Sequence, residues 1–318
     1  MALCNIGRTI IDEARLCYMA NTDLREYLSQ IKKKKQEDGF YLIRTKIPFY
    51  KHCFYVHWGK CGNNSQPVAK MYFSHCDSGT PDNEMQEPEE INKDEYIFYR
   101  LENHMLYREE LEIRKALEIP TLYSMAFKHF TRLDLAVDRK KDIVKTINGL
   151  MKRKDIGTII NGEWEDNHKK VLKNLKEYRD RTLDKAINAE LVVMQANAIK
   201  NKNNGIIVAA YNKMAEIKNK QSDDAGYKQY ILNYYGSPQK SLHRLEVRVN
   251  ASNITKYCEK NKIYMSEEVL FNQTLLTDMY FAFLSRVLRF SYVSTSKSGR
   301  RYSRKTIEWS DIFCNKKV

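Results

Sequence analysis

The sequence predicts an α+β protein with a central antiparallel sheet of about five strands, flanking helices, a C-terminal helix and a basic tail. Two observations predict this class. Segments rich in β-branched and aromatic residues, several alternating between apolar and polar positions, recur along the chain and predict strands. Segments with apolar residues at helical spacing lie before, between and after them. The chain has 318 residues, 42% of them hydrophobic, which is enough to bury a sizeable core.

The N-terminal region, residues 1–94, is expected to begin with helices and continue with strands. Residues 8–19 place apolar side chains at helical spacing, and Thr22 is positioned to cap a second helix over residues 23–34. Residues 39–76 contain FYLIRTKIPFY, CFYVHW and VAKMYFSH, which are rich in β-branched and aromatic residues and predict strands.

The middle region, residues 95–255, alternates between strand and helix patterns. A helical pattern is interrupted at Pro120, and residues 167–200 are highly charged with helical spacing. Between and after them, KDIVKTINGLMKRK predicts a basic amphipathic helix and GTIINGEW a short strand. FTRLDLAVD (residues 130–138), NGIIVAAYNK and LHRLEVRVN predict longer strands.

The C-terminal region, residues 256–318, is expected to hold one long helix followed by a basic tail. The segment SEEVLFNQTLLTDMYFAFLSRVLRF is apolar on more than one side, which favours a core helix and leaves a dimer interface as the alternative. The segment SKSGRRYSRK that follows is strongly basic.

The charge balance indicates the kind of partner. Lys and Arg number 54 against 40 Asp and Glu, a formal net charge of +14. Such an excess attracts polyanions, so nucleic acid is the first expected partner and an anionic membrane surface the second. No apolar run approaches the ~20 residues of a membrane span, and we therefore expect no membrane association. The seven cysteines are odd in number and irregularly spaced, which favours reduced thiols and a cytoplasmic location.

Contacts with nucleic acid are expected at both ends of the chain. The N-terminal residues 1–94 are assigned to a DNA-binding region. In the tail, Arg300, Arg301 and Arg304 interleave with Tyr302 and are expected to contact phosphates, which would position DNA without reading its sequence.

An Arg-Leu-acid frame occurs in FTRLDLAVD. Because side chains alternate along a strand, Arg132, Asp134 and Asp138 share one face of it, while the leucines and valine between them share the other. Asp134 and Asp138 are separated by roughly 13 Å along such a strand, so both can hardly bind one ion. We therefore expect Asp134 to be a metal ligand and keep Asp138 as the lesser candidate.

The same frame returns in HRLEVR. Arg244, Glu246 and Arg248 share a face there, and facing side chains of adjacent antiparallel strands lie about 5 Å apart. Asp134 and Glu246 could then share a hard divalent cation such as Mg²⁺ or Mn²⁺, with the arginines contacting phosphate oxygens. The alternative is a structural ladder of arginines and carboxylates across the sheet.

Three short segments in this order resemble the replication initiation factor family, the initiators of rolling-circle plasmid replication. FTRLDLAVD resembles the R-x-D-x-A-x-D strand of the family, AAYNK its Tyr-Asn-Lys strand, and HRLEVRV its Arg-apolar-Glu strand. The resemblance covers about residues 95–255, which are therefore expected to be the catalytic core. It implies a nicking endonuclease that binds a divalent cation through acidic side chains and whose tyrosine, here Tyr211, becomes covalently joined to DNA.

The chemistry expected of Tyr211 requires activation, because a phenol has a pKa near 10. If residues 205–213 are extended, Lys213 lies on the same face as Tyr211 and could lower its pKa or hold the phosphate. The element YYGSPQKS lies after Tyr-Asn-Lys, whereas a similar element precedes it in the family. Tyr234 and Tyr235 therefore remain alternative nucleophiles.

The function expected from these residues is that of a rolling-circle replication initiator. It would bind double- and single-stranded origin DNA and nick one strand by transesterification, leaving a 5′-phosphotyrosyl link and a 3′-hydroxyl primer. No Walker-type loop is present, so a host helicase is an expected partner, and a homodimer is possible. The alternatives are a relaxase of a mobilisable element and a non-catalytic DNA-binding protein.

Overall fold

The computed structural model describes residues 9–19, 41–45, 54–61, 66–73, 96–101, 110–122, 124–165, 171, 173, 191–194, 205–219, 241–295 and 301–314. Its elements confirm the predicted α+β class, with an antiparallel central sheet. Among the described residues no helix is long and apolar enough to cross a membrane.

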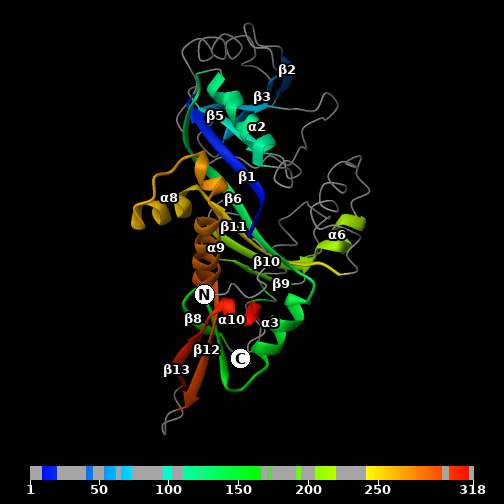
Figure 1. Cartoon of the computed structure of the whole chain (residues 1–318), viewed down its shortest axis with the longest axis vertical. Coiled ribbons are helices and arrows are strands. Elements are labelled where there is room, and N and C mark those ends of the chain that lie inside the picture. Colours follow the sequence, from blue (N-terminus) through cyan, green and yellow to red (C-terminus); the bar gives the residue numbers. More distant parts are fainter. Residues whose placement is uncertain are drawn as a thin grey trace. The chain divides into compact units, whose positions relative to one another are not determined.

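The central sheet has six strands in the order β5-β1-β6-β11-β10-β9, one more than the five expected (Figure 1). The pairs β1–β5, β10–β11 and β9–β10 are antiparallel. Its strands are β1 (Ile10–Met19), β5 (Tyr96–Leu101), β6 (Ala126–Arg139), β9 (Leu191–Met194), β10 (Ile206–Asn212) and β11 (His243–Asn250).

Two smaller sheets complete the β-structure. A three-stranded sheet has the order β2-β3-β4, and a four-stranded sheet has the order β13-β12-β7-β8. Their strands are β2 (Tyr41–Thr45), β3 (Phe54–Cys61), β4 (Gln66–Phe73), β7 (Ile156–Ile160), β8 (Glu163–Glu165), β12 (Leu288–Thr295) and β13 (Arg301–Ile307).

The helices begin and end where the local sequence predicts in several cases. Asp142 caps α3 by accepting a hydrogen bond from the Lys145 amide, and Asn272 caps α9 in the same way at Leu275. Pro120 lies in the last turn of α2, so the helix ends two residues after it. The helices are α2 (Glu110–Leu122), α3 (Ile143–Met151), α6 (Lys213–Asn219), α8 (Ala251–Lys260), α9 (Gln273–Val287) and α10 (Trp309–Phe313), with a 3₁₀ turn over Glu267–Phe271.

The chain divides into two compact units, each made of several chain segments. One unit contains residues 1–12, 134–253 and 269–318, and the other residues 13–133 and 254–268. In the first unit, α9 packs on β10 and β11, and the buried Tyr280 hydroxyl of α9 donates to the Leu245 carbonyl at 3.0 Å. This contact lies on the apolar side of β11, where Leu245, Val247 and Val249 are fully buried.

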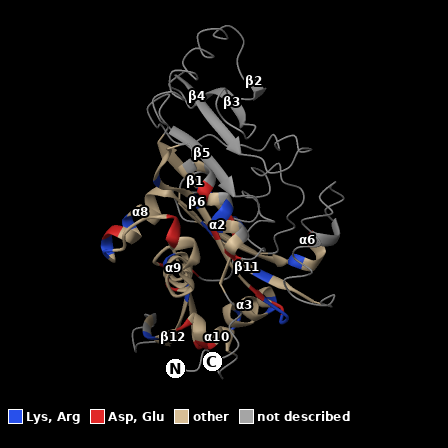
Figure 2. Ribbon diagram, turned by 45° about the horizontal axis from the view of Figure 1, so that its top comes forward, with Lys and Arg blue, Asp and Glu red and all other residues tan. Residues whose placement is uncertain are grey.

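In the second unit, aromatic residues form part of the core. Tyr18 and Phe127 meet edge to face, and Phe127 packs in the same way on Phe130. Arg114 of α2 pairs with Glu110 one turn before it and with Glu268. The helix α8, whose residues fall in both units, carries charges of both signs, as Figure 2 shows.

Three sequence-based predictions of secondary structure are wrong. Residues 10–19 form strand β1 and not a helix, and residues 191–194, inside the segment predicted helical, form strand β9. The described part of the predicted basic tail is not a solvated tail: Arg301–Ile307 form β13, which pairs with β12 and is followed by the short helix α10. The second helix expected over residues 23–34 lies outside the described residues.

A candidate active site on the central sheet

Strands β10 and β11 bring Tyr211 and Glu246 together. Their antiparallel register sets Tyr211 opposite Arg244 and Ala209 opposite Glu246. Because Ala209 has only a methyl group, the Glu246 side chain has room on that face, and the Tyr211 hydroxyl donates to Glu246 Oε2 at 2.8 Å. Both side chains are buried, with 1% of Tyr211 and 4% of Glu246 exposed.

Burial and neighbouring charge perturb both groups. Burial, followed by the fields of Asp12 and Asp134, raises the pKa of Glu246 to about 7, against the opposing influence of Arg248 and Arg244. Burial and then the Glu246 carboxylate raise the pKa of Tyr211 well above its usual value. The pair therefore favours a neutral phenol, and the carboxyl changes its charge near neutral pH.

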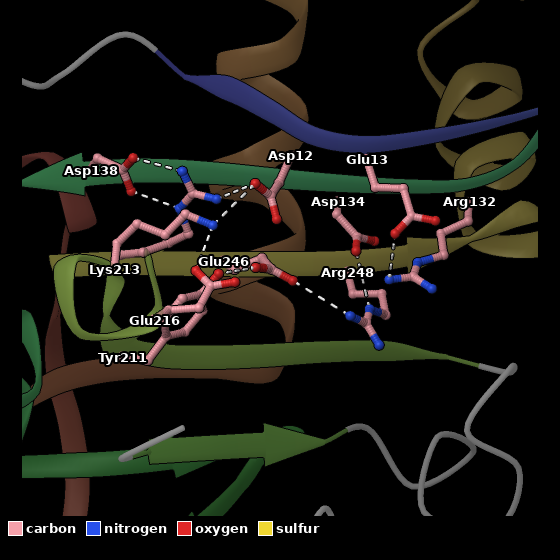
Figure 3. Close-up of polar contacts among 11 residues, drawn as sticks. Asp12, Glu13, Arg132, Asp134, Asp138, Tyr211, Lys213, Glu216, Glu246 and Arg248 are labelled. Carbon is pink, nitrogen blue, oxygen red and sulfur yellow. Dashed lines mark hydrogen bonds and ion pairs between the residues drawn. The ribbon is translucent and has the colours of Figure 1, made fainter. Parts of the chain in front are cut away.

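Arg248 joins the two carboxylates that the sequence predicts as metal ligands. Its Nε donates to Asp134 Oδ2 at 3.2 Å, and its Nη2 lies 3.7 Å from Glu246 Oε1 (Figure 3). The two oxygens of Glu246 thus have different neighbours, since Oε2 accepts from Tyr211 and Oε1 faces Arg248. The structure therefore confirms that Asp134 and Glu246 lie close together on one face of the sheet.

The donor set fits a hard divalent cation in its chemistry. In the part of the chain that the structure describes, no three His, Cys, Asp or Glu side chains form a group that could hold a metal ion. Magnesium, however, is usually held by one or two carboxylates with water and phosphate oxygens as the other ligands. Asp134 and Glu246 supply two carboxylates, and the Arg248 guanidinium lies between them.

Arg244 is held on the same face by two other carboxylates. Its guanidinium makes a bidentate pair with Asp138, with Nε donating at 2.8 Å and Nη2 at 2.7 Å, and its Nη1 donates to Asp12. Arg244 is fully buried and the Asp138 side chain is 2% exposed. This geometry orients the strands β1, β6 and β11, and it leaves Arg244 without access to a phosphate in this conformation.

Lys213 lies beside Tyr211 but not through an extended strand. Strand β10 ends at Asn212, whose side chain accepts from the Ala215 amide, and Lys213 begins α6. The fully buried Lys213 ammonium lies 5.8 Å from the Tyr211 ring centroid. It is 2.6 Å from Glu216 and 3.7 Å from Asp12, so its charge is compensated by these carboxylates.

We refer to these nine residues as the Tyr211 cluster. Five carboxylates face three cations in it, so the cluster carries two excess negative charges when every carboxyl is ionised. Burial and the neighbouring carboxylates disfavour the charged form of Glu246, which agrees with its raised pKa. The members are Asp12, Asp134, Asp138, Tyr211, Lys213, Glu216, Arg244, Glu246 and Arg248 (Figure 3).

The other predicted site residues lie elsewhere. Arg132 pairs with Glu13 at 3.3 Å in the second unit, and Arg304 is exposed on the β12–β13 hairpin. Arg301 begins β13. Tyr234, Tyr235 and Arg300 lie outside the described residues.

Two members of the Tyr211 cluster were missed by the sequence analysis. Asp12 was not considered because its segment was predicted to be a helix. Glu216 follows Lys213 by three residues, a spacing at which side chains meet on a helix, and recognising the start of α6 would have identified it.

Comparison of the chain with protein-family models finds no matching family. Comparison with curated proteins finds no match either. The fold and the site therefore define a class of protein and no more: an α+β protein with a buried cluster of tyrosine, carboxylates and basic residues on one face of its central sheet.

Proposed function

We propose that the protein nicks one strand of DNA by tyrosine transesterification and initiates rolling-circle replication. The observation that carries the proposal is the hydrogen bond from the Tyr211 hydroxyl to Glu246, beside a second carboxylate, Asp134. A nucleophile hydrogen-bonded to a base is the usual arrangement for covalent catalysis. The resemblance of the three strand segments to replication initiators and the net charge of +14 support DNA as the substrate.

In the proposed reaction, Tyr211 Oη attacks a phosphodiester phosphorus. The Oη–P bond forms and the bond from phosphorus to the 3′-oxygen breaks, which leaves a 5′-phosphotyrosyl link. The Tyr211 proton passes to Glu246, and a proton returns to the leaving oxygen as the 3′-hydroxyl. Glu246 is the proton acceptor in this scheme because its Oε2 already accepts the hydrogen bond of the Tyr211 hydroxyl.

Asp134 and Glu246 Oε1 would hold a divalent cation, Mg²⁺ or Mn²⁺, which supplies charge stabilisation at the phosphate oxygens. Arg248, whose side chain is 22% exposed, would leave the two carboxylates and become available to the phosphate. Arg244, Asp138 and Asp12 act as positioning residues, because their ion pairs fix β11, which carries Glu246, against β6 and β1.

The burial of Tyr211 is the observation that favours a second candidate, a non-catalytic DNA-binding protein. With 1% of Tyr211 exposed, a phosphate reaches Oη only after the site opens. In the second candidate the cluster is a structural network of ion pairs, and DNA is bound on other surfaces. The relaxase alternative shares the nicking chemistry and differs in the DNA site that is cut.

The test uses supercoiled plasmid that carries the protein's own replicon, with Mn²⁺, analysed in detergent with and without protease. We expect a nicked product and a protease-sensitive DNA–protein adduct, both lost in Tyr211→Phe. Tyr280→Phe is the matched control, because it also removes a buried tyrosine hydroxyl, which α9 places against the apolar side of β11. It should keep the nicking activity.

Three other outcomes have distinct meanings. A DNA–protein adduct that persists in Tyr211→Phe would indicate that Tyr234 or Tyr235 is the nucleophile. Binding without any nicking by the unmodified protein supports the non-catalytic candidate. Equal loss of activity in Tyr211→Phe and Tyr280→Phe would show that the sheet is sensitive to any lost hydroxyl, and the catalytic role of Tyr211 would lose its support.

A further inference from the structure

A tryptophan lies flat on the four-stranded sheet of the first unit. Trp164 of β8 covers Gly157 of β7 so closely that a Cβ added at Gly157 would lie 1.9 Å from Trp164 Cζ3 and 2.8 Å from Val293 Cγ1. A side chain at position 157 is therefore incompatible with this ring position. Trp164 nevertheless keeps 42% of its surface exposed, so the ring is supported by the sheet and still open to solvent.

The turn between β7 and β8 fixes the position of Trp164. Asn161 and Gly162 have φ angles of 53° and 85°, the left-handed conformations that a two-residue hairpin turn requires. The register that follows sets Trp164 opposite Ile159, and Ile159 opposite Arg289 of β12. Trp164 and Arg289 thus share a face, about 10 Å apart across two strand spacings.

On that face Trp164 and Arg289 are exposed, while Ile159 and Ser291 between them are buried. The opposite face carries Leu288, Phe290 and Ile160, which are fully buried, whereas Arg289 is exposed. Glu163 and Glu165 flank Trp164 in sequence but alternate to the opposite face. The exposed ring and the exposed guanidinium therefore face solvent together.

The chain segment that contains β12 and β13 is strongly basic. Residues 288–307 contain six Lys and Arg and no Asp or Glu, and β12 and β13 form most of this segment (Figure 1). Of the basic residues whose side chains are described, all three are exposed. The six are Arg289, Lys297, Arg300, Arg301, Arg304 and Lys305.

We propose that the exposed Trp164 and Arg289, with the basic residues of the neighbouring strand β13, bind single-stranded DNA by stacking a base on Trp164. An exposed indole ring offers a stacking surface to any base, and the basic residues attract the phosphates. Single strands are preferred over duplex because a base exposes its face only when it is unstacked from its neighbours. The choice of DNA over RNA rests on the proposed nicking function.

The stacking and nicking proposals can fail separately. All binding measurements use the nicking-deficient Tyr211→Phe protein and a labelled single-stranded oligonucleotide, followed by fluorescence anisotropy. The test variant Trp164→Leu keeps an apolar side chain over Gly157 but removes the aromatic ring. We expect binding about 10-fold weaker or more. Tyr264→Leu is the control, because it removes an aromatic ring that is 87% exposed in the other unit, and it should bind as the parent does.

Two more variants separate stacking from folding, and a third tests the contact with phosphate. Gly157→Ala leaves Trp164 in the chain but forces its ring from the sheet, so it should weaken binding in the same direction. Trp164→Phe keeps a ring and should bind more tightly than Trp164→Leu. Arg289→Gln should lower the slope of log affinity against log salt by about 0.7, the value for one contact with a single strand.

The proposal would be overturned by several results. Affinity within twofold of the parent for Trp164→Leu excludes stacking on this ring. Tighter binding of duplex DNA excludes the single-strand preference, and tighter binding of RNA of the same sequence excludes DNA as the intended ligand. Loss of binding in Trp164→Phe equal to that in Trp164→Leu would assign Trp164 a packing role.

Discussion

Replacing Glu246 with glutamine tests the electrostatics of the Tyr211 cluster directly. Glutamine keeps an oxygen that can accept from the Tyr211 hydroxyl but cannot ionise. In the folded protein the pKa of Glu246 is about 7, and in the unfolded chain it returns to about 4.5. The unfolded state therefore loses this proton first as the pH rises, and the wild-type protein loses stability between these two values.

The expected magnitude follows from the size of this shift. Each pKa unit corresponds to 1.36 kcal/mol, so about 3 kcal/mol of unfolding free energy should be lost by the wild-type protein between about pH 4.5 and pH 7. The Glu246→Gln variant should not show this decrease in unfolding free energy, because glutamine does not titrate. The free energy of unfolding of the variant, relative to wild type, should therefore rise by about 2–3 kcal/mol from pH 5 to pH 8.

Urea denaturation at several pH values, with a chelator to remove divalent cations, measures this difference. Titrating groups that do not interact with Glu246 are shared by the two proteins and cancel in the comparison, provided that the m-values agree. A difference that stays constant from pH 5 to pH 8 would refute the reasoning, because Glu246 would then titrate alike in both states. A difference that falls with pH would mean that its pKa is lowered by folding.

Two further predictions concern the same cluster. Mn²⁺ should raise the Tm of the wild-type protein in a thermal-shift assay, and Asp134→Asn should remove this rise; an equal rise in the variant would exclude Asp134 as a ligand. Lys213→Met should lower the free energy of unfolding by about 3–5 kcal/mol, because it removes the ammonium that pairs with the buried Glu216 and lies near Asp12. Adding Glu216→Leu should restore part of that loss, and no restoration would show that the two side chains are not coupled.

The sequence predicted the strands that carry the site because they have clear signals. β6 and β11 alternate between apolar residues that form the core and charged residues on the other face, and β10 is a short apolar run that begins at a glycine. These patterns were sufficient to place Asp134 near Glu246. They could not show that Tyr211 donates to Glu246, since that contact depends on the register of β10 against β11.

β1 was mistaken for a helix for a physical reason. The strand is buried on both faces, with buried residues at nearly every position from Ile10 to Tyr18, so apolar and polar residues do not alternate. Its apolar residues Ile10, Ala14 and Cys17 happen to fit helical spacing. The pairing of β1 with distant strands cannot be recognised from the neighbouring residues in the sequence. Asp12 was therefore not identified as a site residue.

The basic tail illustrates a different limit. Its composition correctly predicted exposed basic residues, but composition does not distinguish a solvated tail from the exposed arm of a hairpin. Trp164 was overlooked for a similar reason. The proposed role of its exposed ring depends on Gly157 beneath the ring and on Arg289 two strands away. Both positions follow from the register of the sheet, which the sequence does not give.

The excess negative charge of the Tyr211 cluster can be compensated in two ways, and the two compete. Protonation of Glu246 removes one negative charge. A divalent cation beside Asp134 and Glu246 compensates both excess charges, but the cation binds only when Glu246 is ionised. Cation binding should therefore release a proton near pH 6 and should tighten as the pH rises towards 7. A structural network of ion pairs, by contrast, gains nothing from the cation and would take up the proton alone. The pH dependence of Mn²⁺ affinity thus separates a catalytic cluster from a structural one without requiring the DNA substrate.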